Sequence, residues 1–275
     1  MAEGNGKVYV VTGALGAIGM PIATGLARTG GTVVLVVRDQ ARGKQACETI
    51  SKATGNPRVE TLHCDMGSTA SIRKAAEELG KRHPKIHVLV NNAAAFSSTR
   101  KTTADGFELQ IGVNHLGHHL LTNLLKPQLE AAGSARVVVM GMPSKTPMRW
   151  DDLMLEKKYD GMTAYGMSKA ANVYFGRELA ERWKGKIAVN VVNPGMVKTT
   201  LIKEAPLPIR IVFAIAATTP EKGAETPLHV ATSPELDGVT GQFFTKKKPG
   251  PFPKGAEDPA SWSRLWETSS KLVKL

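Results

Sequence analysis

The stretch Thr12-Gly13-Ala14-Leu15-Gly16-Ala17-Ile18-Gly19 decides the fold. It follows a short apolar run at residues 7–12 that is typical of a buried strand, and a helical pattern begins at its end and continues over residues 18–29. Glycines in such a turn let the backbone approach a pyrophosphate, which the amides at the helix N-terminus can bind. Because it lies in the first strand–helix unit, the turn predicts dinucleotide binding, although a plain tight turn has the same composition.

The same alternation of strand-like and helix-like segments continues along the chain. Further strands are predicted at residues 32–37, 58–63, 86–90, 136–140, 187–192 and near 241–245. Helices are predicted at residues 41–53, 69–83, 104–132 and 163–183. This rhythm predicts a single-domain α/β fold over residues 1–275, with a Rossmann-type, doubly wound parallel sheet of about seven strands and helices on both faces.

Residues 199–219 depart from this rhythm. Their helical pattern is weak, and Pro206 and Pro208 interrupt it. A segment of this kind is predicted to be an inserted, mobile flap rather than part of the core. Its apolar side chains, which include Ile209, Ile211, Val212 and Phe213, would close over a ligand.

Composition excludes several classes of protein. With 275 residues, 42% of them hydrophobic and 22% charged, the chain can bury a core without disulfide bonds or a structural metal. Cys47 and Cys64 are too few and too irregularly spaced for a zinc site, so we expect packing thiols, a reducing compartment and no metal. We find no signal peptide and no long uncharged apolar run, which predicts a cytoplasmic protein without a membrane anchor.

The net charge of +12 could attract phosphates, acidic lipids or nucleic acid. The positive residues are scattered, however, and their one cluster, at residues 246–248, has no interleaved aromatic side chains of the kind that stack on bases. A solvated basic surface is therefore favoured over a nucleic-acid partner.

Motifs later in the chain resemble those of the short-chain dehydrogenase/reductase superfamily. In the family's order they are Asn91-Asn92-Ala93-Ala94, Asn114, Tyr165-Gly166-Met167-Ser168-Lys169 and Asn193-Pro194-Gly195. Within that superfamily, residues 103–108, 112–118, 164–165, 177–180 and 265–267 are similar to the retinol dehydrogenase-like branch. The resemblance spans nearly the whole chain, and it implies hydride transfer with a nicotinamide cofactor.

The end of the second predicted strand indicates which cofactor is used. NAD-binding folds place a carboxylate there against the ribose hydroxyl, whereas NADP-binding folds place an arginine against the 2′-phosphate. Val37 stands where the family's NAD users carry Asp, and Arg38 follows where its NADP users carry Arg. Asp39 argues mildly for NAD, but it should lie beyond the strand. We therefore expect NADP(H).

The resemblance also assigns cofactor contacts along the chain. They are Gly13, Leu15, Gly16, Ala17, Ile18, Gly19, Arg38, Asp65, Met66, Asn92, Ala93, Tyr165, Lys169, Pro194, Gly195, Val197 and Thr199. Asp65 resembles the residue that contacts the adenine amine, although an acid near the start of a helix is the alternative. Thr199 would secure the nicotinamide amide.

Tyr165 and Lys169 are four residues apart on a predicted helix, so both side chains lie on one face. A cation beside a phenol favours the phenolate and should lower the pKa of the hydroxyl, which can then exchange a proton with a substrate oxygen. The resemblance makes Tyr165 the acid/base, lets Lys169 also hold the ribose, and makes Asn114 the residue that holds a relay water near Lys169. As a bare sequence feature, Asn114 could equally cap or break a helix.

Three positions depart from the family's pattern. Ala17 and Ala94 stand where glycines are usual, and Met142 stands where relatives carry a serine that donates to the substrate carbonyl. Losing one such donor typically costs about 2.7–4 kcal/mol, which slows an enzyme without abolishing catalysis. Ser144, two residues later, either takes the vacant role or is an ordinary loop serine.

These observations favour an NADP(H)-dependent oxidoreductase that interconverts an apolar aldehyde or ketone and its alcohol. Met142, Met148 and Phe96 are the expected lining of the substrate pocket. The alternative is a member that binds NADP(H) without redox turnover and uses the pocket for cyclisation, isomerisation or ligand sensing. By resemblance, a homodimer or homotetramer would form through residues 104–132 and 163–183.

Overall fold

The computed structural model describes residues 4–199, 201, 203–205, 207–253 and 255–275, apart from the side chain of Phe213. Its strands are β1 (Val8–Thr12), β2 (Thr32–Val37), β3 (Val59–His63), β4 (Val88–Asn91), β5 (Arg136–Met140), β6 (Ala188–Asn193), β7 (Phe243–Thr245) and β8 (Lys248–Gly250). They form one sheet in the order β3-β2-β1-β4-β5-β6-β7-β8, parallel throughout except between β7 and β8. The chain changes direction across the sheet between β1 and β4, where open α/β sheets bind ligands at their carboxyl edge.

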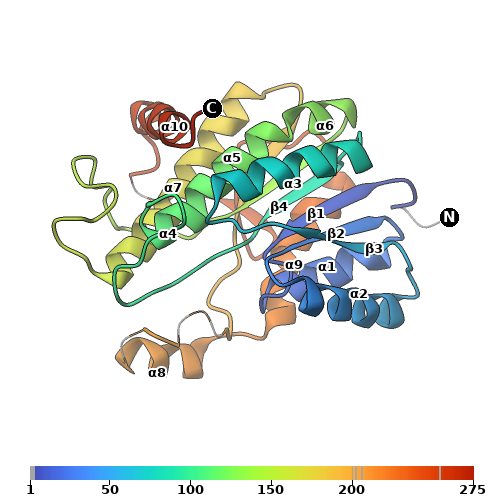
Figure 1. The fold of residues 1–275 in the computed structure, drawn as a ribbon, viewed down its shortest axis with the longest axis horizontal. Helices are drawn as coiled ribbons and strands as arrows, with labels where there is room; N and C mark the ends of the chain where they lie inside the picture. Colours follow the sequence, from blue (N-terminus) through green and yellow to red (C-terminus); the bar gives the residue numbers. More distant parts are fainter. Residues whose placement is uncertain (1–3, 200, 202, 206, 254) are drawn as a thin grey trace.

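Helices cover both faces of this sheet (Figure 1). The α-helices of the described residues are α1 (Gly19–Arg28), α2 (Gln40–Thr54), α3 (Thr69–Arg82), α4 (Leu109–Ile111), α5 (Gly117–Leu124), α6 (Lys126–Ala131), α7 (Gly161–Arg182), α8 (Leu207–Ala216), α9 (Pro220–Thr232) and α10 (Pro259–Val273). Helices α1, α2 and α9 lie on one face, and α3, α5, α7 and α10 lie on the other. The predicted single-domain Rossmann-type α/β architecture is confirmed.

The central strands are apolar on both faces because both faces are covered by helices. Successive side chains of a strand point to opposite faces, so Val10 and Val34 pack into one core cluster while Val11 and Leu35 pack into the other. All four side chains are fully buried. This double burial fixes the positions of the loops at the carboxyl ends of the strands, where the candidate site lies.

The long helix predicted at residues 104–132 is wrong in two respects. Helix α4 begins only at Leu109, after a turn in which Gly106 has φ of +82° and a bridge that pairs Thr102 with Glu108. The segment is then interrupted by a π-turn over Gly112–Leu116, so α4 and α5 are offset from one regular helix. The Asp105-Gly106 pair was a turn signal that the helical periodicity concealed.

The sheet has eight strands rather than about seven. Lys246 and Lys247 both have positive φ, 51° and 63°, and make a tight turn that adds β8 as an antiparallel edge strand. Glycine or asparagine usually marks such a turn, so the sequence gives no warning of it. Helices α9 and α10 were likewise not predicted.

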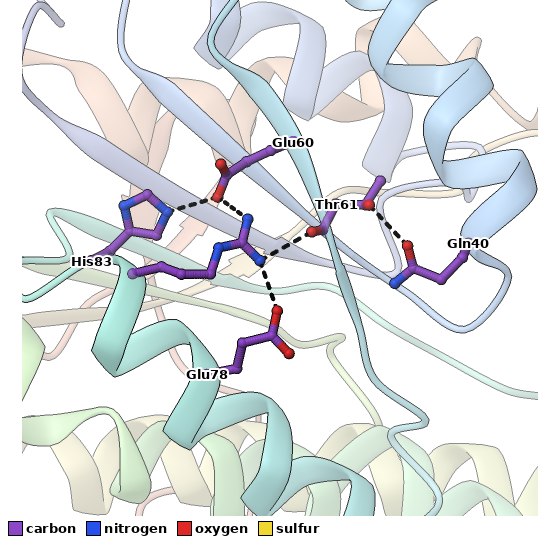
Figure 2. Close-up of polar contacts among 6 residues, drawn as sticks. Gln40, Glu60, Thr61, Glu78 and His83 are labelled. Carbon is purple, nitrogen blue, oxygen red and sulfur yellow. Dashed lines mark hydrogen bonds and ion pairs between the residues drawn. The ribbon is translucent and has the colours of Figure 1, made fainter.

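The opposite edge strand, β3, is joined to α3 by a network of charged side chains that Figure 2 shows. The Arg82 guanidinium contacts the Glu60 carboxylate, and its Nη1 lies 3.0 Å from Glu78 Oε1 and 3.3 Å from the Thr61 carbonyl oxygen. His83 Nε2 lies 2.7 Å from the same Glu60 carboxylate. Charged side chains on an edge strand discourage pairing with a strand of another molecule.

Helix α10 docks on α7 and α5 through stacked cations and aromatic rings. The Arg177 guanidinium lies 4.1 Å from the ring centroids of both Phe252 and Trp262, and that of Arg182 lies 4.6 Å from Trp266. Helix α10 thus covers part of the helix surface through which pairing of two copies was predicted. The homodimer or homotetramer stays a prediction.

The predicted flap at residues 199–219 contains α8, which lies apart from the two helical layers in Figure 1. Leu207, Ile211, Val212 and Ile215 are exposed there. Thr200, Ile202 and Pro206 of the flap, and the side chain of Phe213, lie outside the described residues. Throughout the described chain, we find no helix with the length and apolar character needed to cross a bilayer.

Candidate active site

The glycine turn joins β1 to α1 at the carboxyl edge of the sheet. Gly13 has φ of +62°, and a Cβ at this position would lie 2.7 Å from Cα of Ala93. A Cβ on Gly19 would lie 2.3 Å from the carbonyl oxygen of Gly13, so both positions require glycine. Ile18 at the N-cap of α1 supplies no side-chain hydrogen bond. In the first turn Pro21 has no N–H, and the N–H groups of Met20 and Ile22 donate to carbonyl oxygens, which leaves the Gly19 N–H for an anion.

A cleft of about 720 Å³ opens beside this turn. Of the predicted cofactor contacts, it is lined by Gly13, Leu15, Gly16, Ala17, Ile18, Gly19, Arg38, Asp65, Met66, Asn92, Ala93 and Thr199. The volume is within the range of about 300–1,000 Å³ that is usual for small-molecule and cofactor sites. The shape and the uncapped helix N-terminus fit a dinucleotide.

Five of the predicted contacts lie away from this lining. Tyr165 and Lys169, on α7, do not border the cleft. Pro194, Gly195 and Val197 do not border it either, although they belong to the loop that leads from β6 to Thr199. Val197 is buried and forms a bridge with Thr218. Its side chain packs where a Cβ on Gly223 would lie, so this part of the loop is fastened to α9.

The end of β2 presents arginines to the cleft and no carboxylate from the strand itself. Val37 is buried, and exposed Arg38 and Arg42 both line the cleft. Asp39 follows the strand as expected and also lines the cleft. It is the N-cap of α2, where its Oδ1 accepts a hydrogen bond of 3.0 Å from the Arg42 backbone N–H. This capping role accounts for an acid in the turn. Asp65 similarly accepts a hydrogen bond from the Gly67 N–H, at 2.9 Å.

Thr12 ties the glycine turn to the loop after β4. Its Oγ1 accepts hydrogen bonds from the backbone N–H groups of Asn92 and Ala93, at 2.8 and 3.0 Å. The Asn92 side chain donates in turn to the carbonyl oxygens of Thr12 and Gly13, at 2.9 and 3.2 Å. These bonds hold the two loops that line the floor of the cleft in a fixed relation.

Tyr165 and Lys169 lie together on α7, as their spacing predicts. Lys169 Nζ is 5.5 Å from the centroid of the Tyr165 ring, and the lysine is 7% exposed. Phe96 packs edge-on against the same ring at a centroid distance of 5.8 Å. Within the described part of the chain, neither the Tyr165 hydroxyl nor Lys169 Nζ has a hydrogen-bond partner. Both groups thus keep unused hydrogen-bonding capacity, although neither lines the cleft beside the glycine turn.

The expected lowering of the Tyr165 pKa is wrong for the protein without a cofactor. Burial raises the pKa of this hydroxyl to about 12, and burial also lowers the pKa of Lys169 to about 8. The ammonium lies over the ring face rather than against the oxygen, so desolvation outweighs its attraction for a phenolate. A bound ligand must improve this geometry before Tyr165 can ionise readily.

Asn114 lies inside the π-turn and is fully buried. Its side chain accepts a hydrogen bond of 2.6 Å from the Ala95 N–H and donates to the Ala95 carbonyl and to Ser168 Oγ, at 3.1 and 3.0 Å. Ser168 donates to the Tyr165 carbonyl oxygen. Asn114 therefore joins the loop after β4 to the helix that carries Tyr165 and Lys169, and it neither caps nor ends a helix.

Met142 and Ser144 follow β5 in a sharp turn, in which the Ser144 N–H donates to the Met142 carbonyl oxygen at 2.7 Å. Ser144 Oγ accepts a hydrogen bond of 3.2 Å from the Thr146 N–H and lies against Gly166. No hydrogen bond joins Ser144 to Tyr165, and both are described residues. The replacement of the missing serine by Ser144 stays a prediction.

A second pocket of about 380 Å³ lies between this turn, α7 and the residues Pro253, Gly255 and Ala256. Met142, Ser144 and Met148 line it together with Trp150, Val173 and Tyr174. Two of the three predicted substrate-pocket residues therefore meet here, whereas Phe96 does not line this pocket and packs on Tyr165 instead. The apolar lining suits a hydrocarbon group.

Sequence reasoning gave no role to Thr12, Ser168 or His118, although all three lie within the quoted motifs. Each is buried and hydrogen-bonded to a backbone group that the site depends on. A polar residue that ends an apolar strand or interrupts an apolar helix face could have signalled such a role.

Comparison with known proteins agrees with this geometry. The family model "short chain dehydrogenase" matches residues 7–207. The chain is 34% identical to human retinol dehydrogenase 14, over 98% of this chain and 87% of that one. It is 37% identical to human retinol dehydrogenase 12, over 98% and 86% of the two chains.

Solved structures share the fold. A protein from Mycobacterium paratuberculosis that is described as uncharacterized superposes with a TM-score of 0.81 at 30% identity, over 98% of this chain and 93% of that one. The RhlG/NADP active-site complex from Pseudomonas aeruginosa superposes with a TM-score of 0.71 at 26% identity, over 87% and 94%. The chain belongs to the short-chain dehydrogenase family of nicotinamide-dependent oxidoreductases, with retinol dehydrogenases among its relatives along nearly its full length.

Proposed function

We propose that this oxidoreductase uses NADP(H) to interconvert an apolar aldehyde or ketone and its alcohol. The observation that carries the proposal is the Tyr165–Lys169 pair, a half-buried phenol and a buried ammonium that lack hydrogen-bond partners among the described residues. When bound, the cofactor supplies or accepts the hydride. The chain itself supplies the proton, the orientation and a largely water-excluded site.

In this proposal the Tyr165 hydroxyl donates its proton to the carbonyl oxygen during reduction and takes it back during oxidation. Lys169 balances the negative charge that the phenol gains and binds the ribose hydroxyls of the cofactor. Asn114 keeps the Tyr165 helix in place through Ser168, and its relay water stays part of the proposal. The pocket beside Met142 and Met148 takes the hydrocarbon part of the substrate.

The choice of NADP(H) is supported by Arg38 and Arg42 at the end of β2, with buried Val37 in place of an acid. A guanidinium that binds the 2′-phosphate contributes about 1.5–3 kcal/mol. Among the neighbours, the RhlG complex at 26% identity contains NADP. The flap at residues 199–219 closes over the bound ligands in this proposal.

Steady-state kinetics with NADPH and NADH, on aldehydes and ketones of increasing chain length, test this function. We expect NADPH to be preferred, and Arg38→Ser should raise the KM for NADPH about ten- to hundredfold while leaving that for NADH unchanged. Arg28→Ser, an exposed arginine at the end of α1 outside the cleft, is the matched control.

Equal use of the two cofactors by the unmodified protein would overturn the NADP(H) assignment. Tight binding of NADPH without oxidation by any carbonyl would instead favour the non-redox alternative, for which Met142 in the usual serine position is the motivation.

A further inference from the structure

His118 on α5 connects the floor of the cofactor cleft to Asn114. It is 1% exposed, its Nε2 lies 2.9 Å from Thr12 Oγ1, and its Nδ1 lies 2.8 Å from the Asn114 carbonyl oxygen. Thr12 and Asn114 are themselves fully buried. A single imidazole therefore spans two groups that come from β1 and from the π-turn.

The hydrogen-bond capacity of Thr12 restricts how this imidazole can bind. A hydroxyl has one proton and two lone pairs. The N–H groups of Asn92 and Ala93 occupy both lone pairs, so Oγ1 can only donate towards its remaining neighbours. Those neighbours are His118 Nε2 at 2.9 Å and the Val90 carbonyl at 3.2 Å. Nε2 must therefore be the unprotonated nitrogen.

The other end of the ring leads to the same tautomer. A carbonyl oxygen can only accept, so Nδ1 must carry the proton that it donates to Asn114. Burial lowers the pKa of His118 to about 4, which is consistent with a neutral ring. An imidazolium would direct a second N–H at a hydroxyl whose lone pairs are already filled.

Both ends of this connection lead to the reaction centre. Asn92 and Ala93 line the cofactor cleft, and Asn114 is hydrogen-bonded to Ser168, the residue before Lys169. The π-turn shifts the backbone pairing around Asn114 from the regular helical pattern, so a side-chain donor from His118 helps to fix this carbonyl. A displacement of about 1 Å at a reacting centre can cost a hundredfold in rate.

We propose that His118, held as the neutral tautomer with its proton on Nδ1, is a positioning residue that keeps the cofactor cleft and the Tyr165–Lys169 helix in register. It touches neither the cofactor nor the reacting atoms, and it acts through Asn114 and through the Thr12 bonds to Asn92 and Ala93. The catalytic consequence rests on the proposed role of Tyr165, whereas the tautomer and the connection stand on the geometry alone.

Kinetics of three variants test the positioning role. His118→Phe keeps a ring of similar size without either nitrogen, and it should lower kcat about tenfold or more while carbonyl KM stays within about twofold. His118→Asn retains an N–H donor near the Nδ1 position and should recover much of the lost kcat. His119→Phe is the control, because His119 is a buried neighbour on α5 whose Nε2 bonds Ser270 instead of the site.

We expect the His119 control to lower thermal stability and leave kcat within about twofold of the unmodified protein. A His118→Phe protein that folds and keeps its full kcat would overturn the positioning role. A kcat loss of the same size in His119→Phe would also overturn it, because any buried change in α5 would then suffice.

Nitrogen-15 NMR of the histidine rings tests the tautomer without any activity measurement. We expect a His118 signal with protonated Nδ1 and unprotonated Nε2 that does not change from pH 5.5 to pH 8 and that His118→Asn removes. The opposite tautomer, or titration within this range, would overturn the proposal even if the variants were too unstable for kinetics. If no carbonyl is reduced but this signal is found, the proposed function fails and the connection through His118 stands.

Discussion

Two tyrosines that lie six residues apart show how the same side chain serves structure in one place and chemistry in another. Tyr159 precedes α7, and its hydroxyl accepts from Gln110 Nε2 and donates to the Ser97 carbonyl oxygen, both at 3.0 Å. Tyr165 is on α7, and its hydroxyl has no hydrogen-bond partner among the described residues. Burial raises the pKa of each to about 12.

The pKa values therefore do not distinguish the two tyrosines, and their hydrogen-bond partners do. The surroundings of Tyr159 are complete: Glu108 Oε1 lies 3.3 Å away, and the other oxygen of that carboxylate caps the backbone of Gln110 and Ile111. A hydroxyl with filled bonds stabilises a loop. A buried hydroxyl without them costs stability and is available to a substrate.

Tyr165→Phe should have the largest effect. Removing the acid/base is expected to lower kcat/KM about a thousandfold, within the range usual for general acid–base catalysis, without lowering the melting temperature. Stopped-flow NADPH oxidation and differential scanning calorimetry on the same preparation measure the two quantities. If Tyr165→Phe kept most of its activity, Tyr165 would have only a structural role, as Tyr159 does.

Met142→Ser would restore the serine that the family resemblance predicts at this position. We expect kcat to rise about tenfold or more, because a restored donor can contribute up to about 2.7–4 kcal/mol. Met142→Ala is the control, since it removes the same bulk without adding a hydroxyl. Equal gains in the two variants would mean that pocket space, and not the hydrogen bond, limits turnover.

Lys169→Met tests how much the buried Lys169 ammonium lowers the free energy of unfolding. The pKa of Lys169 falls from 10.5 in the unfolded chain to about 8 when buried, so the folded protein carries the penalty of a buried charge below pH 8. At pH 7 the variant should be more stable by about 1–3 kcal/mol, although inactive.

The pH dependence gives the sign of this effect. Between pH 8 and 10.5 the unfolded chain binds more protons at Lys169 than the folded one, so this group makes the unmodified protein more stable as the pH rises. Urea titrations at pH 7 and pH 10 should show the advantage of Lys169→Met shrinking. Lys44→Met, at an exposed position on α2, should show no such convergence.

Tyr159→Phe should have the smallest effect. Gln110 Nε2 keeps its bonds to the carbonyl oxygens of Ser97 and Gly161, so we expect a loss of only about 1 kcal/mol in the free energy of unfolding. Kinetic constants should stay within about twofold of the unmodified protein. A hundredfold loss of kcat here would remove the distinction between the two tyrosines.

Local patterns were sufficient to predict much of the fold. The predicted strand at residues 136–140 has the bounds of β5, and α7 begins two residues before its prediction and ends one residue before it. Buried apolar runs and helical periodicity are properties of neighbouring residues, so a sequence displays them directly. The π-turn at Gly112–Leu116 does not show in such a pattern, because one extra residue per turn leaves both flanking apolar faces nearly intact.

In the candidate site, too, the features set by local sequence could be predicted and those set by tertiary packing could not. Tyr165 and Lys169 are joined by helical spacing, and the glycine turn by its place after β1, so both could be predicted. The bond between Thr12 and His118 joins positions 106 residues apart and depends on the packed sheet. The pKa of Tyr165 was misjudged for a similar reason, because burial is a tertiary property.

The packing of α10 also means that tryptophan fluorescence can report whether this helix is docked. Trp262 and Trp266 lie on α10 beneath Arg177 and Arg182, and Trp150 lies 4.6 Å from the guanidinium of Arg264 on the same helix. Indole emission responds to contact with water and to nearby charge, so detachment of this helix should shift the fluorescence of these three residues together. The strands β1 to β3 contain no tryptophan, so local unfolding of these strands should change the fluorescence very little.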